Sequence, residues 1–184
     1  MHNVTPWWEM ALVPEWLRRL FQNPQRILSG LVQPGMTVAD IGCGLGFFAL
    51  SLAETVGQSG RVICVDMQQE MLDILQKRAA RKDLLDRIDC HRCEADDLKM
   101  KEPVEFVLMM WMSHEVSDHR RLFQQVRAII KPGGHWLLVE PIIHVPAQEF
   151  SAIRAEALST GLQVRPAPHV GLSRAVLLQS PVKS

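Results

Sequence analysis

An aspartate and a run of glycines stand where a bound ligand could be held. Asp40 lies two residues before the first glycine of the sequence DIGCGLG, which contains Gly42, Gly44 and Gly46. Glycines let the backbone turn sharply and bring its N–H groups close to a ligand. A carboxylate beside such a loop repels a diphosphate and attracts a cation such as an ammonium or a sulfonium. The loop therefore predicts a ligand that is positively charged at this end.

The same loop disfavours one alternative, a nicotinamide-dependent oxidoreductase. In the dinucleotide pattern Gly-x-Gly-x-x-Gly the third glycine would fall at position 47, which is Phe47 here. A second carboxylate, Asp66, ends the apolar run RVICVD. It could accept hydrogen bonds from both hydroxyls of a ribose, or it could cap the helix that follows. Its position at the end of a strand and its spacing from the glycines favour ribose binding.

Four further residues follow predicted strands and could move a proton or hold a metal. His114 and Glu115 follow the apolar run 104–112, and Glu140 and His144 come at the end of the run 135–140 and just after it. His114 is the best candidate for a general base, because a free imidazole titrates near ~6.5. The alternative is that His114 or Glu115 caps the next helix. His114, Glu140 and His144 also form a two-histidine, one-carboxylate set, which would bind a metal only if the three converged. We predict no metal site.

The cysteines indicate neither a zinc site nor a disulfide scaffold. Cys90 and Cys93 form a C-x-x-C, but no second pair is present, and on one strand they would point to opposite faces. Cys43 and Cys64 are the only other cysteines. Four cysteines in 184 residues favour a reduced, cytoplasmic protein.

Strands and helices alternate along the chain, and this predicts how the residues above are brought together. Apolar runs at 37–41, 61–66, 88–95, 104–112 and 135–140 predict strands, with 88–95 near the edge of the sheet and 104–112 in its centre. Residues 49–56, 71–79, 122–130 and 150–158 have helical spacing, and Lys131-Pro132-Gly133-Gly134 should end the third of these helices. Residues 162–180 predict an antiparallel hairpin. The fold class is α/β, a three-layer Rossmann-like sandwich with a seven-stranded, mostly parallel sheet, which binds ligands beyond the carboxyl ends of its strands.

Composition limits the partners that the chain can have. Twenty basic and twenty acidic residues give a formal net charge of zero, which argues against a nucleic-acid partner. No apolar run has the ~20 residues of a membrane span, and MHNVTPWWEM does not resemble a signal peptide. We expect one domain over 1–184, with a helical cap over 1–35 and a core over 36–184. Trp7, Trp8 and Trp16 predict either a lid over the ligand pocket or plain packing of this cap.

Four segments together resemble the successive motifs of class I S-adenosylmethionine-dependent methyltransferases. They are DIGCGLGFFALSLAE, VICVDMQQEML, CEADDL and KPGGHWLLVEP, and the resemblance runs from about residue 37 to residue 141. Within the class, the chain is most similar to methyltransferases of ubiquinone and menaquinone biosynthesis. The resemblance implies that S-adenosylmethionine is the cofactor and that a methyl group is transferred to a small molecule by in-line displacement. A catalytically silent module that keeps this fold is the alternative.

The resemblance also implies a cofactor site. Asp40 and the backbone of Gly42, Cys43 and Gly44 would hold the methionine end of the cofactor. Asp66 would hold the ribose, Met67 would pack on the adenine, and Glu94, Ala95 and Asp96 would lie along the adenine edge; Trp111 is expected in the same site. The family commonly has Gly-Asp-Ala where this chain has Cys93-Glu94-Ala95, so either Glu94 or Asp96 could accept a hydrogen bond from the adenine amino group.

Overall fold

The structure is a computed structural model that describes residues 15–182. Trp7 and Trp8, and with them most of the predicted lid, lie outside the described residues. The helices are α2 (Glu15–Phe21), α3 (Pro24–Leu28), α4 (Phe47–Val56), α5 (Gln69–Ala80), α6 (His119–Ile129) and α7 (Ala147–Leu158), with short 3-10 helices η1 (Leu85–Arg87) and η2 (Ser113–Glu115). The strands are β1 (Thr37–Ile41), β2 (Arg61–Asp66), β3 (Ile88–Arg92), β4 (Val104–Met110), β5 (Ile130–Pro141), β6 (Gln163–Arg165) and β7 (Ser173–Gln179).

The seven strands form one sheet in the order β3-β2-β1-β4-β5-β7-β6. The strands from β3 to β5 pair in parallel, and β7 pairs antiparallel with both β5 and β6. The predicted fold class is therefore confirmed, including the antiparallel hairpin at the end of the chain. The predicted places of β3 at the edge and β4 in the centre are also confirmed.

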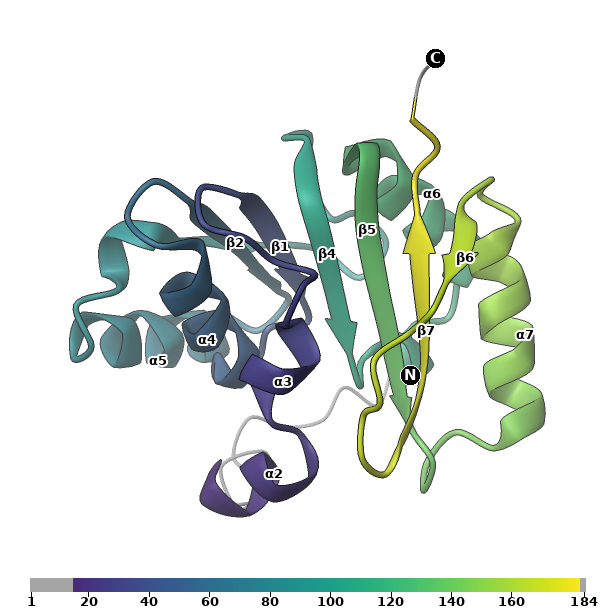
Figure 1. Ribbon diagram of the computed structural model, residues 1–184, viewed down its shortest axis with the longest axis horizontal. Coiled ribbons are helices and arrows are strands. Elements are labelled where there is room, and N and C mark those ends of the chain that lie inside the picture. Colours follow the sequence, from purple (N-terminus) through teal and green to yellow (C-terminus); the bar gives the residue numbers. More distant parts are fainter. Residues whose placement is uncertain (1–14, 183–184) are drawn as a thin grey trace.

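Helices cover both faces of the sheet, which makes the three layers visible in Figure 1. On one face, apolar residues of α3, α4 and α5 pack on the sheet, among them Leu28, Leu52 and Leu75. On the other face, α6 and α7 bury residues such as Phe123 and Ile153. The strands between these two layers are buried on both sides, which explains why β1, β2 and β4 are almost continuously apolar in the sequence.

The winding of the chain reverses between β1 and β4, which are neighbours in the sheet. The helices that follow β1 and β2 lie on one face, and the helices that follow β4 and β5 lie on the other. A crevice forms beyond the carboxyl ends of the strands at such a point. In Figure 1 the arrowheads of β4 and β5 point toward this end of the sheet, and α2 lies beyond it.

Three predicted strand ends are wrong. Strand β5 begins at Ile130, not at residue 135, because Ile130 already pairs with Val104 and residues 131–134 form an irregularity in which Gly133 has a φ of 79°. Strand β4 ends at Met110, since Trp111 adopts a left-handed conformation with a φ of 59°. Strand β3 ends at Arg92, before the predicted end at residue 95.

None of the helices between residues 15 and 182 has both the length and the hydrophobicity needed to cross a bilayer.

Candidate active site

A cavity of about 560 Å³ opens at the carboxyl ends of the strands. Segments after β1, β2, β3 and β4 line it together with α2. Ten residues that the sequence predicted for the site line this cavity: Gly42, Gly44, Asp66, Met67, Glu94, Ala95, Asp96, Trp111, His114 and His144. The other three, Asp40, Cys43 and Glu140, are buried next to lining residues and do not line the cavity themselves.

The glycine loop connects β1 to α4 with a backbone that other residues cannot easily adopt. Gly42, Gly44 and Gly46 have φ values of 74°, 51° and 83°, in the left-handed region. A Cβ on Gly42 would lie 2.8 Å from the side chain of Met112, and one on Gly46 would lie 2.2 Å from Cδ1 of Leu75. The glycines therefore allow the turn, and they also let neighbouring segments approach the loop closely.

Asp40 is a buried carboxylate with an unused oxygen. It is 2% exposed, and its Oδ2 has no hydrogen-bond partner among residues 15–182. Burial and the nearby charge of Asp66 raise the pKa of Asp40 to about 7, and the positive charge of Arg18 opposes this increase. An unsatisfied buried acceptor is costly, so the site is suited to a ligand that brings a cationic donor to Oδ2.

Asp66 holds the glycine loop against the end of β2. Its Oδ2 accepts a hydrogen bond from the backbone N–H of Gly44 at 2.9 Å, and its Oδ1 accepts one from the N–H of Gln68 at 3.0 Å. The second bond closes a turn just before α5; the N-cap of this helix is Gln68, which has no side-chain cap hydrogen bond, so Asp66 does not cap the helix. Asp66 also lines the cavity, and each carboxylate oxygen can accept more than one hydrogen bond. The two bonds that Asp66 accepts therefore leave acceptor capacity for the hydroxyls of a ribose.

The residues expected near an adenine lie together in the cavity wall. Met67 is 36% exposed, so its side chain offers an apolar surface to a ligand. Glu94 forms an ion pair with Lys99, and Oδ2 of Asp96 lies 3.0 Å from Nη1 of Arg121. Both carboxylates have cationic neighbours, so the ion pairs do not distinguish between them as the acceptor.

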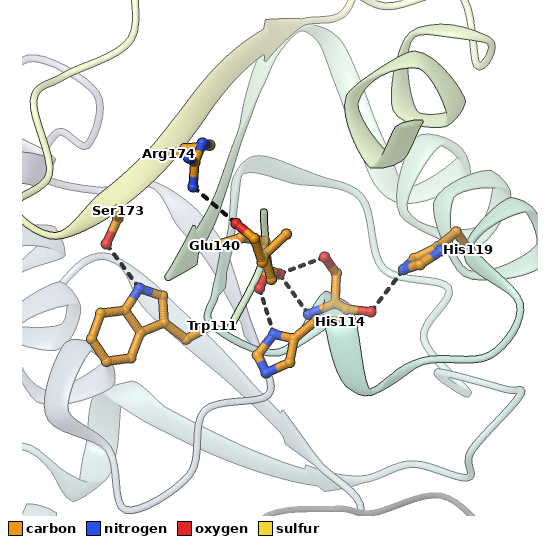
Figure 2. Close-up of polar contacts among 8 residues, drawn as sticks. Trp111, His114, His119, Glu140, Ser173 and Arg174 are labelled. Atoms are coloured by element: carbon orange, nitrogen blue, oxygen red, sulfur yellow. Dashed lines mark hydrogen bonds and ion pairs between the residues drawn. The ribbon is translucent and has the colours of Figure 1, made fainter. Parts of the chain in front are cut away.

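His114 is oriented by a buried carboxylate (Figure 2). Glu140 lies in β5 and is completely buried. Its Oε1 accepts hydrogen bonds from the backbone N–H of Ser113 at 2.8 Å and from Ser113 Oγ at 2.5 Å, and its Oε2 lies 2.5 Å from Nδ1 of His114. The bond to Glu140 raises the pKa of His114, against the opposing effect of burial. The other ring nitrogen, Nε2, points away from Glu140 in Figure 2, and His114 lines the cavity.

His144 joins this group through its ring and not through a shared ligand. The ring centroids of His114 and His144 are 5.9 Å apart, and both oxygens of Glu140 are already engaged. Within the described range, no group of three or more His, Cys, Asp or Glu side chains is arranged to hold a metal ion. The three residues thus come together as an oriented histidine with a second histidine beside it.

Trp111 links the end of β4 to the first residue of β7. Its indole Nε1 donates a hydrogen bond to Ser173 Oγ at 2.9 Å (Figure 2). Its backbone N–H donates to the carbonyl of Val139 at 2.8 Å. These bonds hold the left-handed turn at Trp111, which directs the chain from β4 into η2. The turn therefore helps to place His114.

Cys90 and Cys93 pack on opposite faces of the sheet. Cys90 packs with the apolar residues under α4 and α5, and Cys93 packs with those under α6. Desolvation is the main cause that raises the pKa of Cys90 to about 12 and that of Cys93 to about 11. Two thiols on opposite faces of the sheet cannot hold one metal ion.

The sequence interpretation expected a helical cap at α2 but named none of the residues through which this part of the chain lines the cavity. Leu17, Arg18, Phe21 and Gln22 line the cavity. The only signal in the sequence is that these residues recur at helical spacing, which any amphipathic helix shows.

Comparison with known proteins gives a consistent result. A family model described as a methyltransferase domain matches residues 38–134, more than half of the chain. The chain is 32% identical over 111 residues to a demethylmenaquinone methyltransferase of Oceanobacillus iheyensis, covering 59% of this chain and 46% of that protein. It is 28% identical over 117 residues to a tRNA 5-carboxymethoxyuridine methyltransferase of Escherichia coli K12, covering 62% and 44%.

The chain thus spans about half the length of these two relatives. Among solved structures, a SAM-dependent methyltransferase from Aquifex aeolicus superimposes with a TM-score of 0.78, at 22% identity, over 93% of this chain and 95% of that one. This likeness shows the shared fold. With the family match over 38–134, the glycine loop and the strand order, it places the chain in the family of class I S-adenosylmethionine-dependent methyltransferases.

Proposed function

We propose that this protein transfers the methyl group of S-adenosylmethionine to a small molecule bound in the same cavity. The observation that carries the proposal is the buried, unsatisfied Oδ2 of Asp40 beside the glycine loop. A diphosphate would be repelled there, whereas the ammonium group of an amino acid would satisfy the carboxylate. Nicotinamide-dependent oxidation is disfavoured for this reason and because Phe47 stands at the position of the third glycine.

The residues around the cavity fit the parts of S-adenosylmethionine. Asp40 would take the ammonium, with the backbone of Gly42, Cys43 and Gly44 alongside. Asp66 would accept hydrogen bonds from the ribose, Met67 would pack on the adenine, and Glu94 or Asp96 would accept from its amino group, with Ala95 between them and Trp111 nearby. S-Adenosylmethionine supplies, when bound, a methyl group that is activated by the attached sulfonium.

His114 would take the proton that the methyl acceptor loses. Glu140 holds Nδ1 of His114 at 2.5 Å, which leaves Nε2 to face a substrate. The ring is therefore held in one orientation by a carboxylate that is itself held by the N–H and hydroxyl groups of Ser113. His144 lies beside this ring, where it could contact the same substrate. Alignment of the reactants supplies most of the acceleration in such a displacement, and a general base adds typically 10²–10⁴-fold.

A small acceptor is supported by the shape and charge of the protein. The cavity holds about 560 Å³, and the chain has a net charge of zero. A tRNA acceptor would instead need a basic surface to bind the phosphate backbone.

Calorimetry tests the cofactor part of this proposal. We expect S-adenosylmethionine and S-adenosylhomocysteine to bind the wild-type protein and NAD not to bind. Absence of binding at millimolar S-adenosylhomocysteine would overturn the proposal. Transfer of a labelled methyl group to pools of small metabolites, with tRNA as a separate pool, then tests the acceptor class. Labelling of the tRNA pool alone would contradict a small acceptor, and cofactor binding without any transfer would indicate a catalytically silent module.

A further inference from the structure

Helix α2 brings two unsatisfied donors to the cavity. Gln22, next after this helix, is 1% exposed, and its Nε2 has no hydrogen-bond partner within the described part of the chain. The same holds for Nε of Arg18, four residues earlier. Both residues line the cavity, although both lie outside the segment 38–134 that the family model matches. Buried donors without partners are rare in folded proteins, so they point to a missing acceptor.

The two donors lie at the glycine-loop end of the cavity. The guanidinium carbon of Arg18 is 4.3 Å from the ring centroid of Phe47, the first residue of α4 and the residue directly after the loop. Arg18 is also close enough to Asp40 for each charge to affect the pKa of the other group. Three unsatisfied polar atoms therefore lie near one end of the cavity: donors on the lining residues Arg18 and Gln22, and an acceptor on Asp40, which is buried next to lining residues.

The orientation of Gln22 is set by Arg18. Nη2 of Arg18 donates a hydrogen bond to Oε1 of Gln22 at 3.4 Å. With its oxygen turned toward Arg18, the amide has its NH₂ group free to donate elsewhere. A carboxylate placed at this point would accept from the guanidinium and from the amide together, and guanidinium groups bind carboxylates strongly.

We propose that Arg18 and Gln22 bind the α-carboxylate of the methionine part of the cofactor, while Asp40 binds its α-ammonium. The inference rests on the proposed function and adds two binding residues to it. An α-amino acid is the ligand class that presents one carboxylate and one ammonium on the same carbon, which matches two donors and one acceptor around one end of a cavity. Helix α2 is then part of the cofactor site and not only a cover for the core.

Three nucleosides that differ in the amino-acid part of the cofactor test the inference. S-Adenosylmethionine carries both charged groups, decarboxylated S-adenosylmethionine keeps only the ammonium, and 5′-methylthioadenosine has neither. Their affinities are measured by calorimetry with the full chain at about pH 8.5, where Asp40 is ionised because its pKa is about 7. For the wild type we expect decarboxylated S-adenosylmethionine to bind about 10- to 100-fold more weakly than S-adenosylmethionine, the effect of losing a charged hydrogen bond.

Arg18→Gln should lower the affinity for S-adenosylmethionine by about 10- to 100-fold. The affinity for decarboxylated S-adenosylmethionine should be unchanged or increased. Gln22→Leu, which removes the amide donor and keeps the approximate size, should show the same pattern with a smaller loss. Arg19→Gln is the matched control, since Arg19 is the neighbouring arginine of α2 and does not line the cavity. Its affinities should equal those of the wild type.

Unchanged affinity of Arg18→Gln for 5′-methylthioadenosine shows that the variant is folded. The inference is overturned if Arg18→Gln lowers the affinities for S-adenosylmethionine and for its decarboxylated analogue equally, or if it lowers neither affinity. If Arg18→Gln also loses binding of 5′-methylthioadenosine, the test rests on Gln22→Leu, which must show the selective loss of affinity for S-adenosylmethionine for the inference to stand. Failure of the wild-type protein to bind any of the three nucleosides would instead overturn the proposed function.

Discussion

At the scale of single residues, Asp40 has opposite effects on binding and on stability. In the free protein its pKa is raised to about 7 from an ordinary value of 3.8, mainly by burial. The charged form is therefore disfavoured in the folded state. This cost is absent below about pH 3.8, grows between pH 3.8 and 7, and is complete above pH 7. A ligand ammonium would reverse the preference and favour the charged form.

Asp40→Asn is predicted to weaken cofactor binding and to stabilise the free protein at pH 8. With wild type, affinity for S-adenosylhomocysteine should rise about tenfold per pH unit between pH 5.5 and 6.5 and level off near pH 7, because binding requires ionised Asp40. The variant should show a flat profile. Calorimetry measures the affinities, and urea unfolding measures the free energy of unfolding. A variant that keeps the wild-type slope would show that another group titrates.

The second prediction at this scale concerns the proton acceptor. His114→Gln should lower kcat by about 10²–10⁴-fold and leave the affinity for S-adenosylhomocysteine unchanged, if His114 acts on the methyl acceptor and not on the cofactor. Steady-state kinetics and calorimetry on the same preparation check both parts. A loss of cofactor affinity that accounts for the loss of rate would contradict the assignment.

Glu140→Gln should shift the pH profile of His114, because Glu140 is the main cause of its raised pKa. The rise of kcat/KM with pH would then move to lower pH. The raised pKa also stabilises the fold: this contribution is complete below the ordinary value of 6.5 and is lost as the pH rises through the folded value. The variant should therefore lose more stability at pH 5.5 than at pH 9.

Residue types and the predicted strand ends were enough to propose Asp40, Asp66 and His114 as site candidates, because each stands near the end of a predicted strand. They did not identify the partners of these residues. The hydrogen bond between His114 and Glu140 spans 26 positions and depends on the pairing of β4 with β5. Arg18 and Gln22 were missed because their chemistry lies in two unsatisfied atoms, which only the packed structure reveals.

At the scale of elements, the period of apolar residues predicted every strand of the sheet and the four long helices. It failed where tertiary pairing overrides local preference. Helix α6 ends before Lys131-Pro132-Gly133-Gly134, as expected. These four residues are nevertheless part of β5, because the strand already begins at Ile130, which pairs with Val104. Trp111 ends β4 through a backbone conformation that the sequence of an apolar run does not indicate.

The turn at Gly46 gives a prediction at this scale. Gly46→Ala places a Cβ 2.2 Å from Leu75 Cδ1 at a φ of 83°, so either the Leu75 side chain or the start of α4 must shift. Gly161→Ala is the matched control, since Gly161 has a φ of 84° and open space around its Cβ position. We expect about 1 kcal/mol of destabilisation for the control and about 1–3 kcal/mol more for Gly46→Ala. Urea unfolding measures both, and equal losses would show that the contact with Leu75 relaxes freely.

At the scale of the whole molecule, the two apolar cores pack against opposite faces of the same sheet. Residues of β1, β2 and β4 contribute alternately to the core under α4 and α5 and to the core under α6 and α7. If the helices on one face unfolded, apolar residues of the strands that both cores share would be exposed to solvent. The cavity is built from both halves as well, since its lining includes residues after β1 and β2 and residues after β4 and β5. A ligand in the cavity is therefore coupled to the stability of the entire described fold.

Thermal unfolding should show one cooperative transition that the cofactor shifts as a unit. S-Adenosylhomocysteine at about 100 times its Kd adds about 2.7 kcal/mol to the stability of the folded state. For a chain of this size, that corresponds to an increase in Tm of about 5–10 °C. NAD at the same concentration should leave Tm unchanged. Differential scanning calorimetry measures the transition; two separate transitions, of which S-adenosylhomocysteine shifts only one, would show that the two layers fold independently and that the single-domain prediction is wrong.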